Sequence, residues 1–292
     1  MKSSEDTANW LKEVVQKFLD TSTDNSLKAA TEEKAWDRVL LGFSRGDDPL
    51  YLAYQKKYVG PFHWTPLEAF NTAFPDSSVR PDELTVISWV LPQTEATKAD
   101  NRKENLYPGE RWARTRIFGQ QANVKLHEHV VAVLNETGYP AMAPLLSPQW
   151  TQYLSEKYGF ASNWSERHAA YAGGLGTFGL CDGLITPLGK AMRLGSVIAR
   201  ISIPPTPRPY TDHHAYCLFF SKGTCQKCID RCPAGAISEQ GKDKQKCKAY
   251  LWPVTEEYVK SHYGFDGYGC GLCQTKVPCE SRIPIRPDVE DN

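Results

Sequence analysis

Eight of the nine cysteines of this 292-residue chain lie in its C-terminal quarter, at spacings typical of thiolate ligands. In chain order they are Cys217, Cys225, Cys228, Cys232, Cys247, Cys270, Cys273 and Cys279. Each half of the set contains a C-x2-C turn, which places two thiolates on one side of a tight loop. Each half also supplies four thiolates, so the set predicts two [4Fe–4S] clusters and with them electron transfer.

The C-x2-C-x3-C-P run that ends at Cys232 and Pro233 is the most specific part of this pattern. In two-cluster ferredoxins the last cysteine of such a run binds the other cluster. By that rule one cluster takes Cys217, Cys225, Cys228 and Cys279, and the other takes Cys232, Cys247, Cys270 and Cys273. Pro233 and Gly235 suit the chain reversal that this crossing needs.

Two structural zinc sites are the alternative, because zinc also binds C-x2-C pairs and four thiolates per ion would use eight cysteines. The C-x3-C-P ending and the Ala-Gly-Ala-Ile sequence after it favour iron–sulfur clusters. Cys217 and Cys279 depart from the usual ferredoxin spacing, and loop insertions would explain both departures. Cys181 stands apart from the set and is expected to be a small buried hydrophobic residue.

The overall composition excludes some classes of protein. Lys+Arg and Asp+Glu both number 34, so no global charge attracts nucleic acid or anionic lipid. Apolar runs are too short for a membrane span, and the N-terminus has no secretory signal pattern, although an atypical signal stays an alternative. An odd number of cysteines argues against a disulfide framework. We therefore expect a cytoplasmic protein that does not contact a membrane.

Periodicity predicts the elements that must position the cysteines. We expect helices over about 8–19, 110–136 and 164–172, a buried strand over 84–91, a long surface loop over 93–109, a short extended segment over 139–146, and strands around 183–186 and 195–203. The prolines between 204 and 209 indicate a stiff linker and a domain boundary. The alternation of strands and helices before it predicts an α/β or α+β layered domain.

Several segments resemble a known family. CQKCIDRCPAGAIS, KCKAYL and GYGCGLCQTKVPC resemble the cluster domain of epoxyqueuosine reductases. Glu166-Arg167 and the Gly-Leu-Gly turn at 174–176 are similar to the Glu-Arg and glycine turn of that family. GLITPLGKAMRLGSVIARI is similar to the matching region of reductive dehalogenases. The resemblance covers roughly residues 80–285.

The resemblance implies an α+β fold: a nitroreductase-like α/β domain followed by a ferredoxin-like two-[4Fe–4S] domain. On this basis residues 1–79 form a mostly helical N-terminal region, 80–209 the cobalamin and substrate domain, and 210–292 the cluster domain. The implied cobalamin contacts are Gly174, Leu175, Gly176, Thr177, Thr186 and Arg193. The alternative for the glycines is an ordinary tight turn that ends a helix at Ala172.

One departure from the family concerns the proton donor. Epoxyqueuosine reductases carry a proton-donating Asp shortly before the Glu-Arg pair, and counting back from the glycine turn this chain has Phe160 there. A departing oxygen needs an acid within hydrogen-bond reach, so epoxide deoxygenation on tRNA is in doubt. The candidate acids are Tyr158, Tyr171 and His168, with Glu166 as a further one. Reductive dehalogenases use a tyrosine.

The expected function is that of an iron–sulfur oxidoreductase that delivers low-potential electrons to a cobalamin. The substrate, a small molecule or a tRNA-borne group, is not assigned, and the electron donor is a low-potential protein such as flavodoxin or ferredoxin. A ferredoxin-like electron carrier without cobalamin is the alternative, and a zinc-stapled binding module is a third hypothesis. Basic residues flank the cysteines, as a docking face or as compensating charge: Lys222, Lys227, Arg231, Lys242, Lys244, Lys246 and Lys248.

Overall fold

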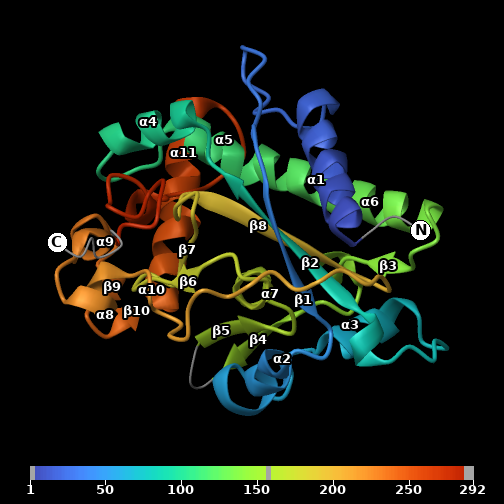
Figure 1. Ribbon diagram of the computed structural model, residues 1–292. Helices are drawn as coiled ribbons and strands as arrows, with labels where there is room; N and C mark the ends of the chain where they lie inside the picture. Colours follow the sequence, from blue (N-terminus) through green and yellow to red (C-terminus); the bar gives the residue numbers. More distant parts are fainter. Residues whose placement is uncertain (1–3, 156–158, 286–292) are drawn as a thin grey trace, which may run out of the picture.

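Helices and strands both contribute to the fold, which confirms the predicted mixed class (Figure 1). The computed structural model describes residues 4–155 and 159–285. Within them, four strands form a central antiparallel sheet in the order β1-β2-β8-β3. Their bounds are Leu40–Arg45 for β1, Thr85–Pro92 for β2, Ala141–Met142 for β3 and Met192–Ala199 for β8.

Strand β2 is buried along its whole length because helices cover both faces of the sheet. Ile87, Trp89 and Leu91 point to one face, while Val86 and Val90 point to the other. A strand buried on both faces must be apolar at successive positions, which explains the unbroken run that predicted it.

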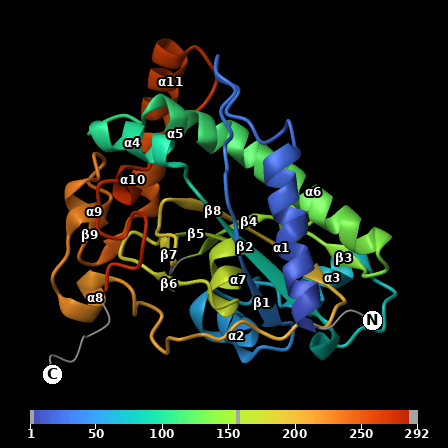
Figure 2. The ribbon, with the colours of Figure 1, turned by 45° about the horizontal axis from the view of Figure 1, so that its top comes forward.

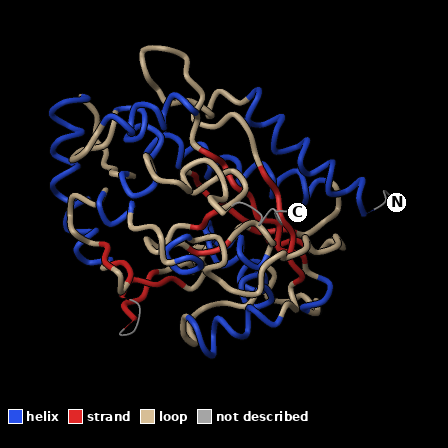
Figure 3. The backbone as a smooth tube through the Cα atoms, turned by 60° about the vertical axis from the view of Figure 1, so that its left-hand side comes forward, coloured by secondary structure: helices blue, strands red, loops and turns tan. Residues whose placement is uncertain are grey.

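Two helical layers enclose this sheet. Helices α1 (Ser4–Thr21) and α6 (Gln120–Glu136) pack together on the Trp89 face, as Figure 2 shows. The other face is covered by α2 (Pro49–Ala53), α3 (Pro66–Ala73) and α7 (Glu166–Ala172). Strand β1 belongs to residues 1–79, so that region shares its sheet and cores with residues 80–209. Figure 3 shows the strands of the sheet inside and the helices outside.

The predicted helix over 110–136 is confirmed, with a change of winding near its start. Helix α5 (Glu110–Arg114) continues through a π-helical stretch (Thr115–Gly119) into α6. Such stretches recur at functional sites. The predicted helices over 8–19 and 164–172 correspond to α1 and α7, and the extended segment over 139–146 contains β3.

The expected loop over 93–109 is wrong, because α4 (Glu95–Lys103) lies within it. The helix begins at Thr94, whose hydroxyl accepts a hydrogen bond from the Thr97 amide at 3.2 Å. Its buried side chains are those of Thr97, Lys98 and Asn101. A helix whose buried face is polar has no periodic pattern of apolar residues, and periodicity therefore does not predict α4.

The remaining elements are short and lie mostly towards the cysteine-rich end. Three hairpins pair β4 (Gln152–Ser155) with β5 (Gly159–Ser162), β6 (Thr177–Phe178) with β7 (Leu184–Ile185), and β9 (Ile237–Ser238) with β10 (Gly241–Lys242). The helices are α8 (Leu218–Lys222), α9 (Lys227–Asp230), α10 (Lys244–Ala249) and α11 (Glu256–Tyr263). The strands predicted around 183–186 and 195–203 correspond to β7 and β8, which belong to different sheets.

Candidate metal centre and adjoining cavity

Four of the predicted ligands surround one small void. Its wall contains the cysteines that the crossing rule assigns to one cluster, together with Leu180, Ile185 and Lys190. These cysteines are Cys217, Cys225, Cys228 and Cys279, which we call the first thiol group. Cys217 caps α8, and Cys228 lies in α9. Cys279 reaches the void from the end of the second cysteine loop, more than fifty residues further along the chain.

The other predicted ligands gather separately. Burial, together with the nearby sulfurs of Cys247 and Cys232, raises the pKa of the Cys270 thiol to about 11. The sulfurs of Cys247 and Cys273 both raise the pKa of Lys242, so both lie near its ammonium. We call Cys232, Cys247, Cys270 and Cys273 the second thiol group. Cys232 therefore lies with the second half of the sequence pattern and Cys279 with the first.

The turn after Cys232 has the expected conformation. Gly235 has φ +56°, a left-handed backbone that glycine adopts without strain. Its amide donates to the Cys232 carbonyl at 3.1 Å, and the Ala236 amide donates to the Cys232 sulfur at 3.3 Å. The Cys232 sulfur therefore accepts a backbone hydrogen bond within its own turn.

None of the nine cysteines forms a disulfide. Among residues 4–155 and 159–285, no group of three or more His, Cys, Asp or Glu side chains is placed to hold one metal ion. The donor set of each thiol group is nevertheless four thiols, which is the chemistry that a cubane cluster uses. The assignment of these cysteines as ligands stays a prediction.

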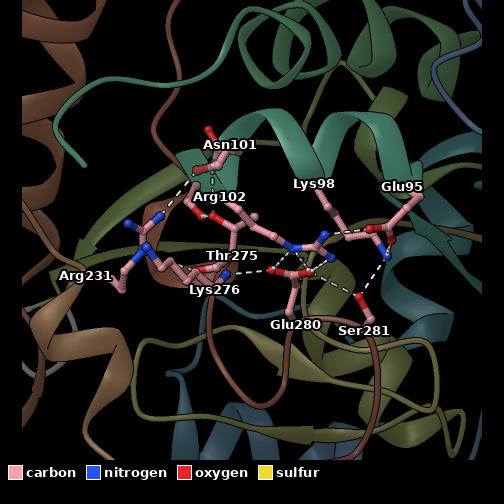
Figure 4. Close-up of polar contacts among 10 residues, drawn as sticks. Glu95, Lys98, Asn101, Arg102, Arg231, Thr275, Lys276, Glu280 and Ser281 are labelled. Carbon is pink, nitrogen blue, oxygen red and sulfur yellow. Dashed lines mark hydrogen bonds and ion pairs between the residues drawn. The ribbon is translucent and has the colours of Figure 1, made fainter. Parts of the chain in front are cut away.

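Helix α4 holds the second cysteine loop in place (Figure 4). Arg102 donates to the buried carboxylate of Glu280, with Nε 2.9 Å from Oε1. Asn101 donates to the Thr275 hydroxyl at 3.0 Å and to the Cys270 carbonyl at 3.2 Å. The buried ammonium of Lys98 donates to the Ser281 hydroxyl at 2.8 Å. Helix α4, in the segment where a loop is expected from the sequence, therefore fixes the backbone beside Cys270, Cys273 and Cys279.

Arg231, one of the flanking basic residues, is also part of this anchoring. Its guanidinium donates to the carbonyls of Glu104 at 2.7 Å and of Leu272 and Thr275 at 3.3 Å each. These bonds tie α9, and thus Cys228 and Cys232, to the second loop. For Arg231 the structural role is therefore the one that its contacts support.

Cys181 is buried, as expected, but its surroundings are not those of a hydrophobic residue. Hydrogen bonds from the thiols of Cys228 and Cys273 lower the pKa of Cys181, and the ammonium of Lys190 adds to this effect. The Lys190 Nζ lies 3.2 Å from the Cys181 sulfur. The ninth cysteine thus lies between the two thiol groups, a position that its isolation in the sequence did not reveal.

A larger cavity of about 550 Å³ lies beside the cysteine region. Its wall includes Tyr54, Phe160, Arg167, His168, Tyr171 and Asp182. Lys244 of α10 also lines it and donates to the Phe160 carbonyl at 3.0 Å, so the cysteine region closes one side. A cavity of this size is typical of small-molecule or cofactor sites.

Two of the three candidate acids face this cavity, and Tyr158 lies outside the described residues. Burial raises the pKa of Tyr171, which keeps its hydroxyl protonated and able to donate. Burial, with a small effect of neighbouring cations, lowers the pKa of His168 to about 3. His168 is therefore neutral near pH 7 and has no imidazolium proton to give. Burial raises the pKa of the fourth candidate, Glu166, to about 8.

Asp182 is the carboxylate that the sequence reasoning missed. It is the single carboxylate among the described residues that line the cavity. It has φ +61°, a left-handed backbone that is uncommon for a residue with a side chain and recurs at functional sites. Phe160 lines the same cavity. Only the polar turn Cys-Asp-Gly in an apolar segment could have indicated this residue.

The predicted cobalamin contacts lie elsewhere, and none of the six lines the larger cavity. The glycine turn packs against protein: a Cβ at Gly174 would lie 2.7 Å from the Pro207 carbonyl, and one at Gly176 2.2 Å from the Ile185 carbonyl. Leu175 belongs to the core. The Thr177 hydroxyl accepts from the Tyr216 amide, and that of Thr186 closes its own turn. These contacts favour the tight-turn alternative.

Arg193 lies in a group of cations near the cavity. Burial and the nearby guanidinium groups of Arg116 and Arg167 lower the pKa of Arg193 to about 9. Within the part of the chain that the structure describes, none of these three arginines forms an ion pair with a carboxylate. Arg167 lines the cavity, so the excess positive charge adjoins it.

No helix in the described ranges combines the length and apolar composition that crossing a bilayer requires.

Comparison with known proteins gives several relatives that are named epoxyqueuosine reductase. No protein-family model matches the chain. The chain is 37% identical over 120 residues to the epoxyqueuosine reductase of Bacillus anthracis, a match that covers 39% of this chain and 29% of that protein. It is 34% identical over 130 residues to the Staphylococcus aureus epoxyqueuosine reductase, covering 42% and 32%. The matched segment thus spans less than a third of these relatives.

Solved structures to which the chain shows similarity include the epoxyqueuosine reductase of Bacillus subtilis, with a TM-score of 0.49 and 17% identity over 99% of this chain and 70% of that one. A reductive dehalogenase gives a TM-score of 0.47 and 15% identity over 85% and 30%. The sequence matches confirm the resemblance that the cysteine motifs predicted: over the matched segment, this chain is a homologue of the epoxyqueuosine reductases.

Proposed function

We propose that this chain is an iron–sulfur oxidoreductase whose thiol groups each hold one [4Fe–4S] cluster. The observation that carries the proposal is the crossing of Cys232 and Cys279, which gives two sets of four thiols in the pattern of a two-cluster ferredoxin. The nitroreductase-like and ferredoxin-like division at residue 210 is part of the same proposal.

The clusters, when bound, would supply one-electron reduction at potentials that reach about −700 mV. The chain itself would hold them through the thiols, exclude water through the apolar wall of Leu180 and Ile185, and place them beside the cavity. The substrate would be reduced in that cavity. The electron donor would be a low-potential protein such as flavodoxin or ferredoxin.

We also propose that the chain binds cobalamin in or beside the larger cavity. The relation to epoxyqueuosine reductases supports it, as does the unpaired charge of Arg193, Arg116 and Arg167, which suits the phosphate of a cobalamin. The packed glycine turn does not support a corrin contact there. We therefore derive no chemical step through cobalamin.

Tyr171 is the proposed proton donor, and Asp182 is proposed as a carboxylate that positions a donor or the substrate. Both line the cavity, and the buried Tyr171 hydroxyl stays protonated. Asp182 has Lys244 and His214 as charged or titratable neighbours. Phe160 is the residue that we expect at the place of the family's acid and cannot donate a proton, whereas Asp182 brings a carboxylate to the same cavity. The substrate class, a small molecule or a tRNA-borne group, follows from the relatives alone: one solved structure is of an epoxyqueuosine reductase with a modified tRNA stem loop.

Anaerobic purification of the full chain tests the proposal. We expect about eight iron and eight sulfide ions per chain and a brown protein that absorbs near 400 nm. Stoichiometric zinc without sulfide would contradict the proposal and favour a zinc-stapled module. Gel filtration with added cobalamin tests the proposed cobalamin binding: retained corrin supports it, whereas two clusters without corrin favour the ferredoxin-like electron carrier.

A further inference from the structure

Lys190 is buried at the wall of the first thiol group. It follows the turn between β7 and β8, and only 2% of its surface is exposed. Its amide donates to the carbonyls of Cys279 at 2.8 Å and Glu280 at 3.1 Å. A Cβ at the preceding residue, Gly189, would lie 2.1 Å from the Glu280 carbonyl, so the backbones are in close contact. The position of Lys190 is therefore fixed relative to Cys279.

The ammonium of Lys190 faces sulfur. Its Nζ lies 3.2 Å from the Cys181 sulfur, and Cys279 is within hydrogen-bond reach. No carboxylate of residues 4–155 and 159–285 forms an ion pair with it. A buried ammonium without an anion costs several kcal/mol. The sulfurs of the first thiol group, with the cluster that they would hold, are the anions that the proposed function places beside it.

We propose that Lys190 is the buried counter-cation of the cluster in the first thiol group and raises its reduction potential. The inference rests on the proposed function. Reduction adds one electron to a cluster that is already anionic, and a fixed positive charge nearby stabilises the added charge. Net charge and hydrogen bonds to the sulfurs are known determinants of cluster potential. Because Lys190 is buried, solvent screens its charge little.

The test is a redox titration of the anaerobic, reconstituted full chain, followed by electron paramagnetic resonance, with iron and sulfide analysis of each sample. In Lys190→Met we expect one of the two midpoints to fall by at least a tenfold change in the reduction equilibrium, which is 59 mV for one electron. Lys190→Arg keeps the charge and should stay near wild type. Lys227→Met is the matched control, because Lys227 precedes Cys228 but is exposed and paired with Asp230.

The outcomes are distinct. Two intact clusters with unchanged midpoints in Lys190→Met overturn the inference. Loss of one cluster in Lys190→Met supports it if Lys190→Arg restores that cluster, and overturns it if Lys190→Arg does not, since the requirement would then be one of shape. Wild-type protein without iron and sulfide would instead refute the proposed function.

Discussion

Cys232 and Cys279 are the two cysteines that distinguish a crossed from an uncrossed ligand pattern, because each lies near thiols from the other half of the cysteine set. The spacing rule for two-cluster ferredoxins predicts this crossing. Cys279 lines one void with Cys217, Cys225 and Cys228, and Cys232 lies near Cys247 and Cys270. The crossing has a consequence that can be measured with pairs of substitutions.

The double variant Cys225→Ser/Cys279→Ser should keep about four iron ions per chain, because both thiols belong to one group. Cys225→Ser/Cys232→Ser should lose nearly all iron, because it removes one thiol from each group. Iron and sulfide analysis after anaerobic reconstitution distinguishes the two. The reverse order of iron contents would contradict the crossing.

The carboxyl oxygens of Glu166 are buried. Burial raises its pKa to about 8 in the folded chain, above the ordinary value of 4.5, so the protonated form is favoured by folding. The associated stability is present below about pH 4.5 and is lost as the pH rises towards 8. Glu166→Gln, which mimics the neutral acid, should therefore stabilise the chain at pH 8, by on the order of 2 kcal/mol, and have little effect at pH 5.

Chemical unfolding of both proteins at the two pH values measures this difference. Glu68→Gln is a suitable control for general charge effects, because Glu68 is an exposed capping residue of α3. Equal stabilisation by Glu166→Gln at both pH values would contradict a buried, protonated carboxyl.

Among the elements, the second cysteine loop depends on glycine geometry. Gly271 lies between Cys270 and Cys273 with φ +66°, and a Cβ there would lie 1.8 Å from the Trp112 ring. Gly223, after α8, has φ +65° but open space around it. Substitutions at the two positions can therefore distinguish the cost of a left-handed backbone from the cost of steric overlap.

Gly223→Ala should therefore cost only the left-handed backbone penalty, about 1–2 kcal/mol, with iron content unchanged. Gly271→Ala should displace the loop from α5 and reduce the iron content to about four per chain. Iron analysis and thermal unfolding of the two variants, side by side, measure both effects. Full iron content in Gly271→Ala would mean that the loop adapts without losing a ligand.

Whole-molecule stability should depend on pH through buried histidines. Burial lowers the pKa values of His63 and His127 to about 4 and that of His168 to about 3. Below about pH 6.5 the unfolded chain takes up protons that the folded chain does not, so the free energy of unfolding falls as the pH falls.

Each of these histidines contributes up to about 1.4 kcal/mol per pH unit in that range. Unfolding followed at pH 7.5, 6.5 and 5.5, with iron content checked at each pH, measures the slope. His168→Gln should reduce the slope, whereas the exposed His262 provides a control in His262→Gln. An unchanged slope in His168→Gln would mean that His168 takes up a proton in the fold.

Sequence patterns predicted the elements that depend on apolar periodicity, namely β2, α1 and α6. They failed for α4, whose buried face carries Lys98 and Asn101. These polar side chains can be buried only because they bond to residues that are distant in the sequence. Asp182 and Lys190 gave no spacing signal either. Their significance depends on which loops the fold brings together, and local patterns do not contain that information.

The turn that contains Cys181 and Asp182 places two neighbouring side chains in different surroundings, a thiol among the sulfurs of the two thiol groups and a carboxylate on the cavity wall. An electron reaching a cluster held by these sulfurs and a substrate beside the Asp182 carboxylate would then be separated by a single peptide unit. A glycine inserted between the two residues would lengthen that link while leaving every proposed ligand in the chain. Electron arrival at the cluster and reduction of the substrate should then become kinetically separable steps.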